Sequence, residues 1–325
     1  MICECHEYSD VRICSTLSGY YSQHSHLIRV ICIIFMEIKK AIIPIAGLGT
    51  RFLPLSKVVP KELWPLADIP ALQYIIEEAK LSGIEEIIFV ISLDKKIVLD
   101  YFKASPNIEK ILKERKKDYI LKTFKEFEDT LKEISFSYVL QKKPLGDGHA
   151  VLQAAKMVAG ESCAVLFGDD VVDSNTPCLS QLFKIFKTCQ KPILALYQVP
   201  KEKLPSYGIV GIEKIANRLY KIKKIVEKPS IEEAPSDLAI VGKYILTPEV
   251  FDYLKKTHPD KTGEIRLAGA FEKMLKDGKI IYGYEFEGKW LECGNKLDWL
   301  KSNLYFSLKH PKYGPELRNF LKEIL

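Results

Sequence analysis

A glycine-rich turn that directly follows an apolar run is the part of this sequence best suited to chemistry. The turn, residues 47–54, reads Gly-Leu-Gly-Thr-Arg-Phe-Leu-Pro and follows the apolar run 41–46. Glycines let the backbone approach a phosphate and offer N–H donors, and the Arg51 guanidinium adds a charged fork for phosphate oxygens. Lys61 stands shortly after it, on a loop that could return over the same phosphates. We therefore predict a nucleotide-binding loop.

Two other phosphate-binding motifs do not fit this turn. A dinucleotide fingerprint needs a third glycine where Phe52 stands, and the P-loop pattern with its terminal Gly-Lys-Ser/Thr is absent. The sequence also offers no convincing ribose-binding acid after a second strand. A dehydrogenase is therefore the weaker alternative.

Asp169 is a candidate metal ligand. It follows the apolar run 163–167 in a Gly-Asp-Asp sequence, at the carboxyl end of an expected strand. That end is the usual ligand-binding edge of a parallel sheet. A carboxylate there can hold Mg2+, which takes oxygen ligands together with substrate phosphates. In isolation, however, an Asp after a strand is more often a turn residue or a helix cap.

The elements that must position these residues follow from the apolar pattern. From residue 39 onward, apolar runs of strand length alternate with segments of helical period, which predicts an α/β fold with a mostly parallel central sheet and helices on both faces. The expected strands are 41–46, 87–91, 135–141 and 163–167. The expected helices are 70–82, two amphipathic helices within 107–134 laid over the sheet, and 147–159.

Past residue 173 the pattern changes. A helix is expected near 179–188, strands at 193–199 and 239–246, and β-rich stretches at 207–213 and 219–226. Helices beginning at Pro248 and Glu264, a last strand at 280–286 and a helix from about Asn295 complete the expectation. Because no repeat or linker separates these segments, we expect one core domain with a β-rich elaboration and C-terminal helices.

Composition excludes several classes of function. The 325 residues carry 48 basic and 42 acidic side chains, a net charge of +6, without a concentrated basic stripe, so we expect no nucleic-acid partner. The apolar run 30–36 is far shorter than the ~20 residues that cross a bilayer, so we expect no membrane association. Scattered cysteines and a start unlike a signal peptide indicate a cytoplasmic protein.

The first 35 residues differ in composition from the rest. They contain no lysine but hold three of the six histidines and four of the eight cysteines. We expect residues 1–35 to be an unstructured extension or a mis-assigned start, with the folded domain spanning 36–325. A metal-binding arm built on Cys3, Cys5 and His6 is the alternative, but it lacks the paired ligand spacing of zinc sites.

Several short blocks in a fixed order extend the nucleotide-loop prediction. With Arg51 and Lys61 in this arrangement, the chain from about residue 39 to 308 resembles the sugar-nucleotide pyrophosphorylases, most closely the bacterial UTP:glucose-1-phosphate uridylyltransferases. The blocks are Leu-Gly-Asp-Gly-His-Ala at 145–150, Phe-Gly-Asp-Asp at 167–170, Tyr-Gly-Ile-Val at 207–210, Val-Glu-Lys-Pro at 226–229, Ala-Ile-Val-Gly-Lys-Tyr at 239–244 and Cys-Gly-Asn-Lys at 293–296.

The resemblance implies a Rossmann-like nucleotidyltransferase domain that uses Mg2+, joins UTP to glucose 1-phosphate and forms a homo-oligomer. The implied catalytic residues are Arg51, Lys61, Asp169 and Lys228, with Asp169 and Glu292 as metal ligands. The implied nucleotide-binding residues are Ala46, Gly47, Leu48, Gly49, Gln141 and Gly146. The implied sugar-binding residues are Tyr207, Gly208, Glu227, Lys228, Val241 and Gly242. Gln141 suits a pyrimidine edge because an amide both donates and accepts, although it could also simply end a strand in solvent.

The sequence departs from the family's pattern at three places. Glu292 stands where an Asp is common, Ile69 replaces a basic residue, and the segment 264–269 lacks the usual Gln, Thr and Asp. These departures concern the sugar selectivity and the second metal ligand. A dTTP:glucose-1-phosphate thymidylyltransferase is the main alternative. A non-catalytic nucleotide-sensing subunit of the same fold is another, but it would be expected to lose the charged catalytic set.

Overall fold

The computed structural model describes residues 37–325, of which residues 38–325 form one compact unit. The predicted extension, residues 1–35, lies outside the described residues. Along 37–325, no helix is both long enough and apolar enough to span a bilayer.

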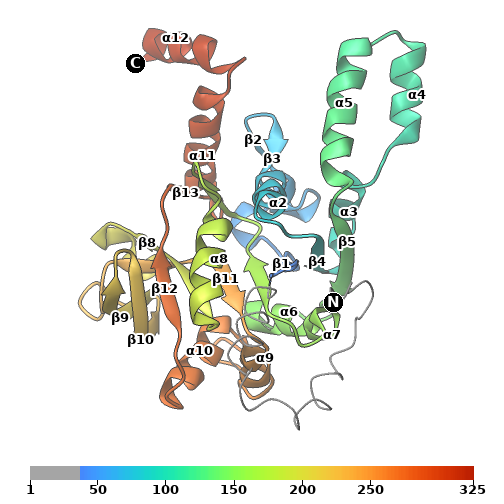
Figure 1. Ribbon diagram of the computed structural model, residues 1–325. Helices are drawn as coiled ribbons and strands as arrows, with labels where there is room; N and C mark the ends of the chain where they lie inside the picture. The colour runs from blue at the N-terminus through green and yellow to red at the C-terminus, as the bar shows by residue number, and fades with distance from the viewer. Residues whose placement is uncertain (1–36) are drawn as a thin grey trace, which may run out of the picture. The chain divides into compact units, whose positions relative to one another are not determined.

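The compact unit is built on a central sheet that has nine strands within the described residues (Figure 1). The strand order is β5-β4-β1-β6-β11-β8-β12-β10-β9. In that order the strands are β5 (Ser135–Leu140), β4 (Glu86–Ile91), β1 (Lys40–Pro44), β6 (Cys163–Leu166), β11 (Leu238–Leu246), β8 (Ile193–Gln198), β12 (Tyr282–Glu285), β10 (Leu219–Glu227) and β9 (Gly208–Ala216).

The first half of the sheet is parallel, as the sequence predicts. Strand β1 pairs in parallel with β4 and β6, and β4 pairs in parallel with β5. The side chains of β1 alternate between two buried clusters, with Ile43 in one and Ile42 in the other. Pro44 is tolerated because it is the last residue of β1, and the backbone N–H of Ile45 resumes the pairing by donating to Val90.

The second half of the sheet is mixed. Strand β11 runs antiparallel to both β6 and β8, and β10 runs antiparallel to β9 and β12. Strand β12 is parallel to β8. The change of direction at β11 brings its middle residues against the loop that follows β6.

Helices cover both faces of the sheet, as predicted. One face carries α2 (Ala71–Leu81), α3 (Ile97–Tyr101) and α8 (Cys178–Cys189), and the other carries α6 (Asp147–Gln153), α7 (Ala155–Val158), α9 (Pro248–Lys255) and α10 (Leu267–Lys276). Helix α10 begins three residues after the expected start at Glu264. Residues 264–266 instead lead into the helix without regular secondary structure.

A buried ion pair ties β11 to two of these helices. Lys243 of β11 is fully buried, and its Nζ donates to Glu78 Oε2 of α2 at 2.7 Å. The other carboxylate oxygen of Glu78 accepts the backbone N–H of Leu179, in the first turn of α8, at 3.0 Å. The pair therefore joins three elements at one point.

The two helices predicted within 107–134 are present, but the prediction that they lie over the sheet is wrong. Helices α4 (Pro106–Glu114) and α5 (Asp118–Leu131) form a hairpin that projects away from the sheet (Figure 1). Leu131 is buried, whereas Ile108, Ile111 and Ile120 remain about half exposed. Their helical spacing predicts the helices correctly, but only the end of the α5 stripe, at Phe127 and Leu131, packs on the core, and the rest of the two stripes is half exposed.

Two short strand pairs and a last helix are elements that the sequence analysis did not expect. Strand β13 (Lys289–Glu292) pairs antiparallel with β7 (Asp170–Asp173), and β2 (Pro65–Leu66) pairs with β3 (Ile69–Pro70). Helix α11 (Lys296–Lys309) begins where predicted, because the Asn295 side chain accepts the Asp298 N–H as a cap. Helix α12 (Gly314–Ile324) follows it.

Candidate active site

Two adjacent cavities open at the carboxyl ends of the parallel strands. The first has a volume of about 410 Å3 and the second about 280 Å3. Both are lined by Asp147, at the start of α6, and by Phe167, just after β6. A ligand made of two parts could therefore place one part in each cavity, on either side of Asp147 and Phe167.

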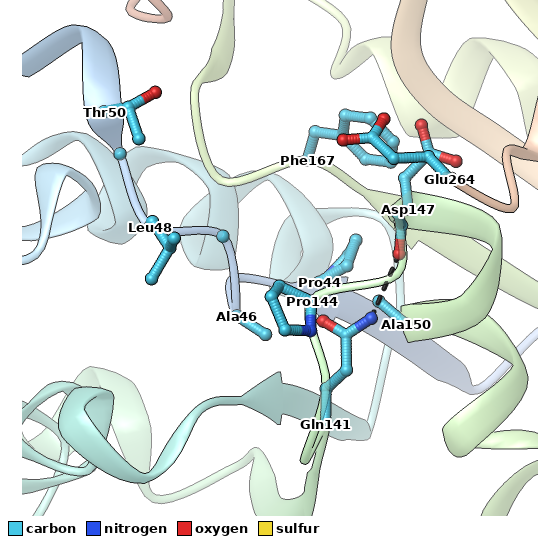
Figure 2. Close-up of a pocket in the computed structure, with 13 residues that line it drawn as sticks. Pro44, Ala46, Leu48, Thr50, Gln141, Pro144, Asp147, Ala150, Phe167 and Glu264 are labelled. Carbon is cyan, nitrogen blue, oxygen red and sulfur yellow. Dashed lines mark hydrogen bonds between the residues drawn. The ribbon is translucent and has the colours of Figure 1, made fainter. Parts of the chain in front are cut away.

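The first cavity contains all the predicted nucleotide-binding residues. It is lined by Ala46, Gly47, Leu48, Gly49, Gln141 and Gly146, together with Thr50 and Glu264. Figure 2 shows the Gln141 side chain reaching into this cavity from below, with a dashed line from its amide nitrogen.

Gln141 is held in one orientation. It is only 6% exposed, so it does not simply end a strand in solvent. Its Nε2 donates to the Gly146 carbonyl at 3.1 Å and lies 2.8 Å from His149 Nδ1. Because a carbonyl can only accept, this bond fixes which end of the amide is the nitrogen. The Gln141 amide oxygen remains as an acceptor suited to a nucleobase.

Gly146 could not be another residue without a change in the backbone. Its φ is +97°, and a Cβ built on it would lie 2.6 Å from the Ile265 carbonyl oxygen. The neighbouring backbone is fixed there, since Ile265 N–H donates to Leu145 at 2.7 Å. The turn before α6 is therefore packed directly on the segment before α10.

The second cavity gathers most of the predicted catalytic and sugar-binding residues. It is lined by Arg51, Asp169, Tyr207, Gly208, Glu227, Lys228, Gly242 and Glu292, which come from six separate segments of the chain. Lys61 adjoins it through an ion pair with Asp169. Val241 is different, because its side chain is fully buried in β11. A sugar-binding role for Val241 stays a prediction.

Lys61 and Asp169 form a close ion pair between Lys61 Nζ and Asp169 Oδ2. Burial alone would lower the pKa of Lys61, but the Asp169 carboxylate outweighs it and the pKa is raised. Burial alone would raise the pKa of Asp169, but the Lys61 ammonium outweighs it and the pKa is lowered. Both groups therefore stay charged near neutral pH. Arg51 lies at the same cavity, with its Nη1 3.4 Å from the Gly294 carbonyl oxygen.

A second ion pair, which sequence reasoning missed, supports the Lys61 loop. Lys95 Nζ donates to both carboxylate oxygens of Glu62, at 2.9 and 3.0 Å, and both residues are buried. Burial lowers the pKa of Lys95 even though Glu62 opposes that shift. Glu62 directly follows Lys61, so the pair anchors this loop to the turn after β4. Nothing local in the sequence marks Lys95, which stands among other charged residues.

Asp170 was also missed, although it is the second acid of the Gly-Asp-Asp block. Its carboxylate accepts the Gly242 backbone N–H at 3.1 Å and the Trp290 indole N–H at 2.7 Å. Burial, together with the nearby Asp169 and Glu292 carboxylates, raises the pKa of Asp170 to about 7. A Cβ on Gly242 would lie 2.6 Å from Phe167 Cβ, so this contact between β11 and the loop after β6 requires glycine.

Glu292 faces the same small space as Asp169. A Cβ built on Gly294 would lie 3.1 Å from Glu292 Oε1 and 3.3 Å from Asp169 Oδ2. Glu292 Oε2 accepts the Tyr207 hydroxyl, and burial raises the pKa of Glu292. Residues 37–325 contain no group of three or more His, Cys, Asp or Glu placed to hold a metal. Two carboxylates fit Mg2+, which commonly takes one or two of them and completes its shell with substrate phosphates and water.

Lys228 is held in an unusual backbone conformation at the end of β10. Its φ is +48°, which is uncommon for a residue with a side chain. Its N–H donates to the Tyr207 carbonyl at 3.0 Å, and the next residue, Pro229, is buried. The local backbone therefore places Lys228 and Tyr207 together at the second cavity.

A model of the nucleotidyl transferase family matches residues 40–306. The chain therefore belongs to the nucleotidyl transferase family. It is 42% identical over 288 residues to a UTP–glucose-1-phosphate uridylyltransferase of Staphylococcus haemolyticus, covering 89% of this chain and 99% of the relative. A second such enzyme, from Staphylococcus saprophyticus, is also 42% identical, over 289 residues, with the same coverage.

Solved structures agree with these relatives. A UTP-bound UGPase from Acinetobacter baumannii has a TM-score of 0.80 at 36% identity and covers 89% of this chain and 100% of its own. A UDP-glucose pyrophosphorylase complexed with UDP-glucose has a TM-score of 0.77 at 36% identity. The match covers 84% of this chain and 100% of that structure's chain. The expected α/β fold and nucleotidyltransferase class are confirmed, and the dehydrogenase alternative is wrong.

Proposed function

We propose that this protein transfers a uridylyl group from UTP to glucose 1-phosphate, releasing UDP-glucose and pyrophosphate. The observation that carries the proposal is the pair of adjacent cavities, which are lined by residues that the sequence predicts to bind the nucleotide and the sugar, in a chain whose residues 40–306 match the nucleotidyl transferase family. The uracil occupies the first cavity and the hexose the second. The α-phosphorus of UTP reacts near the wall that the cavities share.

No protein nucleophile is needed for this reaction. An oxygen of the ionised sugar phosphate forms a bond to the α-phosphorus, and the bond from that phosphorus to the pyrophosphate oxygen breaks. The protein contributes in-line positioning and neutralisation of charge. Arg51 and Lys61 draw negative charge toward the leaving pyrophosphate, and Lys228 orients the attacking phosphate. The Lys61–Asp169 pair supports these assignments because it keeps a cation at the second cavity.

Asp169 and Glu292 are the residues that would hold Mg2+. When bound, the ion would neutralise phosphate charge at the reacting centre. The remaining ligands would have to come from the substrate phosphates and water, since the protein offers two carboxylates at this point.

The sugar is recognised by the end of β10, at Glu227, and by the start of β9. Glu227 would accept hydroxyl groups of the hexose, and Tyr207 and Gly208 bring backbone close to it. The Glu292–Tyr207 hydrogen bond supports this arrangement because it connects the sugar side of the cavity to the metal side.

Two alternatives remain useful as contrasts. The thymidylyltransferase alternative has weaker support, since a putative glucose-1-phosphate thymidylyltransferase from Bacillus anthracis is only 24% identical and shares the fold with a TM-score of 0.64. A non-catalytic nucleotide-sensing subunit would not need Arg51, Lys61, Asp169 and Lys228 together.

We further propose that the enzyme is a cytoplasmic homo-oligomer whose catalytic domain spans 36–325, in keeping with its scattered cysteines and the composition break.

A pyrophosphate-release assay tests the proposal directly. The protein is supplied with Mg2+, each of four nucleoside triphosphates in turn, and the 1-phosphates of glucose, galactose and mannose. UTP with glucose 1-phosphate is expected to give the highest kcat/KM. A tenfold or greater preference for dTTP would move the assignment to the thymidylyltransferase, and an absence of turnover with every pair would favour the sensing subunit.

A further inference from the structure

Arg266 stands in the segment 264–269, where the sequence departs from its family, and its guanidinium is surrounded by carboxylates. Its Nη1 lies 3.0 Å from Glu227 Oε1, its Nε 2.8 Å from Asp260 Oδ2, and its Nη2 2.8 Å from Glu264 Oε2. The side chain is 21% exposed and lines the second cavity. Each of the three guanidinium nitrogens is therefore committed to a different acid.

This arrangement argues against a direct role of Arg266 in phosphate binding. Three carboxylates within hydrogen-bonding distance more than neutralise one guanidinium, so little positive charge is left for a substrate anion. The planar fork of Arg is instead suited to holding several carboxylates in fixed directions, which a Lys ammonium does less well. Arg266 is placed to organise its neighbours.

The neighbour that matters is Glu227, which also lines the second cavity. Arg266 engages Glu227 Oε1, whereas Glu227 Oε2 lies only 3.1 Å from the Cβ position of Gly208. One oxygen is thus taken up by the arginine, and the other is held beside the Gly208 backbone at the cavity wall. Without the arginine, the Glu227 side chain, which is 34% exposed, could turn toward solvent.

The backbone that carries Arg266 is fixed to the nucleotide side of the site. Ile265 N–H donates to Leu145 at 2.7 Å, and Leu267 N–H donates to the Asp147 carboxylate at 2.8 Å. Arg266 therefore spans from the turn beside the first cavity to the acid in the second. It has a rigid base from which to hold Glu227.

We propose that Arg266 is a positioning residue that fixes Glu227 for the hydroxyl groups of the sugar and so sets the sugar selectivity of this chain. The inference rests on the proposed function, because it takes Glu227 as the residue that contacts the hexose. Arg266 itself takes no part in the transfer step. Its contribution is to hold an acceptor in place before the sugar phosphate arrives.

The test compares R266Q, E227Q and the double variant in the pyrophosphate-release assay. R266Q is expected to raise the KM for glucose 1-phosphate at least fivefold, leave the KM for UTP within twofold of wild type, and narrow the preference for glucose over galactose 1-phosphate. The double variant is expected to be no more than twofold worse than E227Q, because Arg266 acts through Glu227. R266K, which keeps the charge but not the fork, should fall between wild type and R266Q.

R218Q is the matched control, since Arg218 bonds the carbonyls of Glu285 and Phe286 at the other end of β10. It should leave both KM values unchanged. An unchanged sugar KM in R266Q, an equal rise in both KM values, or effects that multiply in the double variant would each overturn the inference. If R266Q fails to fold, an R266K enzyme with wild-type selectivity would overturn it instead. A wild-type enzyme that does not join UTP to glucose 1-phosphate would refute the proposed function itself.

Discussion

Replacing Lys228 by Met isolates the charge that orients the attacking phosphate. Methionine keeps nearly the same length and flexibility, so the change removes an ammonium without opening a large gap. A hydrogen bond to a charged group contributes about 1.5–3 kcal/mol, which corresponds to a loss of roughly 10- to 150-fold in kcat/KM for glucose 1-phosphate. The KM for UTP should be nearly unchanged, because the uracil cavity lies on the far side of Asp147 and Phe167.

The backbone at Lys228 supplies an internal control. Its left-handed φ of +48° costs a non-glycine residue on the order of 1 kcal/mol, a strain that glycine does not bear. K228G should therefore lose activity as K228M does, while its thermal midpoint stays at or above that of wild type. K228R, which keeps a charge on a different head group, should retain more activity than either.

Initial rates measured while each substrate is varied, together with thermal melts of all four proteins, decide the matter. The reasoning would be refuted if K228M weakened UTP binding and left the sugar terms untouched. It would also fail if K228G kept the activity of wild type, because the ammonium would then not be needed for the reaction.

Four other perturbations test separate parts of the structure. D169N should nearly abolish turnover and its dependence on Mg2+, because a neutral amide is a poor ligand for a hard cation, and a Mg2+ titration measures this. E292Q should raise the Mg2+ requirement while E292D is tolerated; a curve for E292Q that superimposes on wild type would leave Asp169 as the single protein carboxylate on the ion. K243M should lower the free energy of unfolding by about 3–5 kcal/mol in urea melts, because it leaves the Glu78 carboxylate buried without its partner, and K243M/E78Q should recover most of that loss. Burial raises the pKa of Asp147 to about 6 from its ordinary 3.8, so wild type should lose up to about 3 kcal/mol of stability relative to D147N as pH rises from 4 to 7, and melts that differ equally at both pH values would contradict this.

Local patterns in the sequence predict much of the fold because they depend on neighbouring residues. The uniformly apolar runs at β1, β4 and β6 signal strands that are buried on both faces. The cap at Asn295 is a short-range hydrogen bond, so its position follows from residue type alone. The nucleotide cavity was predictable for the same reason, since its glycine turn and Gln141 each sit at the end of a strand.

Features that depend on distant segments could not be predicted in this way. The apolar run of β11 carries no information about its direction, and that direction sets Gly242 against Asp170. Nothing local marks Lys95 or Arg266 as part of the site, because Glu62 and Glu227, the acids that connect them to it, lie more than 30 residues away in the chain. The amphipathic pattern of 107–134 predicts helices that bury one face on the sheet, and no local signal shows that they pack mainly on each other and touch the core only at the end of α5.

The projecting hairpin of α4 and α5 is a segment in which the protein should tolerate inserted residues. Its two helices project from the fold next to β5 (Figure 1), and none of their residues lines either cavity. Extending both helices by the same number of turns would lengthen the projection without altering where the chain enters and leaves the sheet. The entropic cost of bringing the two ends of an inserted segment together grows only slowly with its length. Insertions in the hairpin, whether they arise in evolution or are engineered as a tag, should therefore have little effect on the catalytic activity.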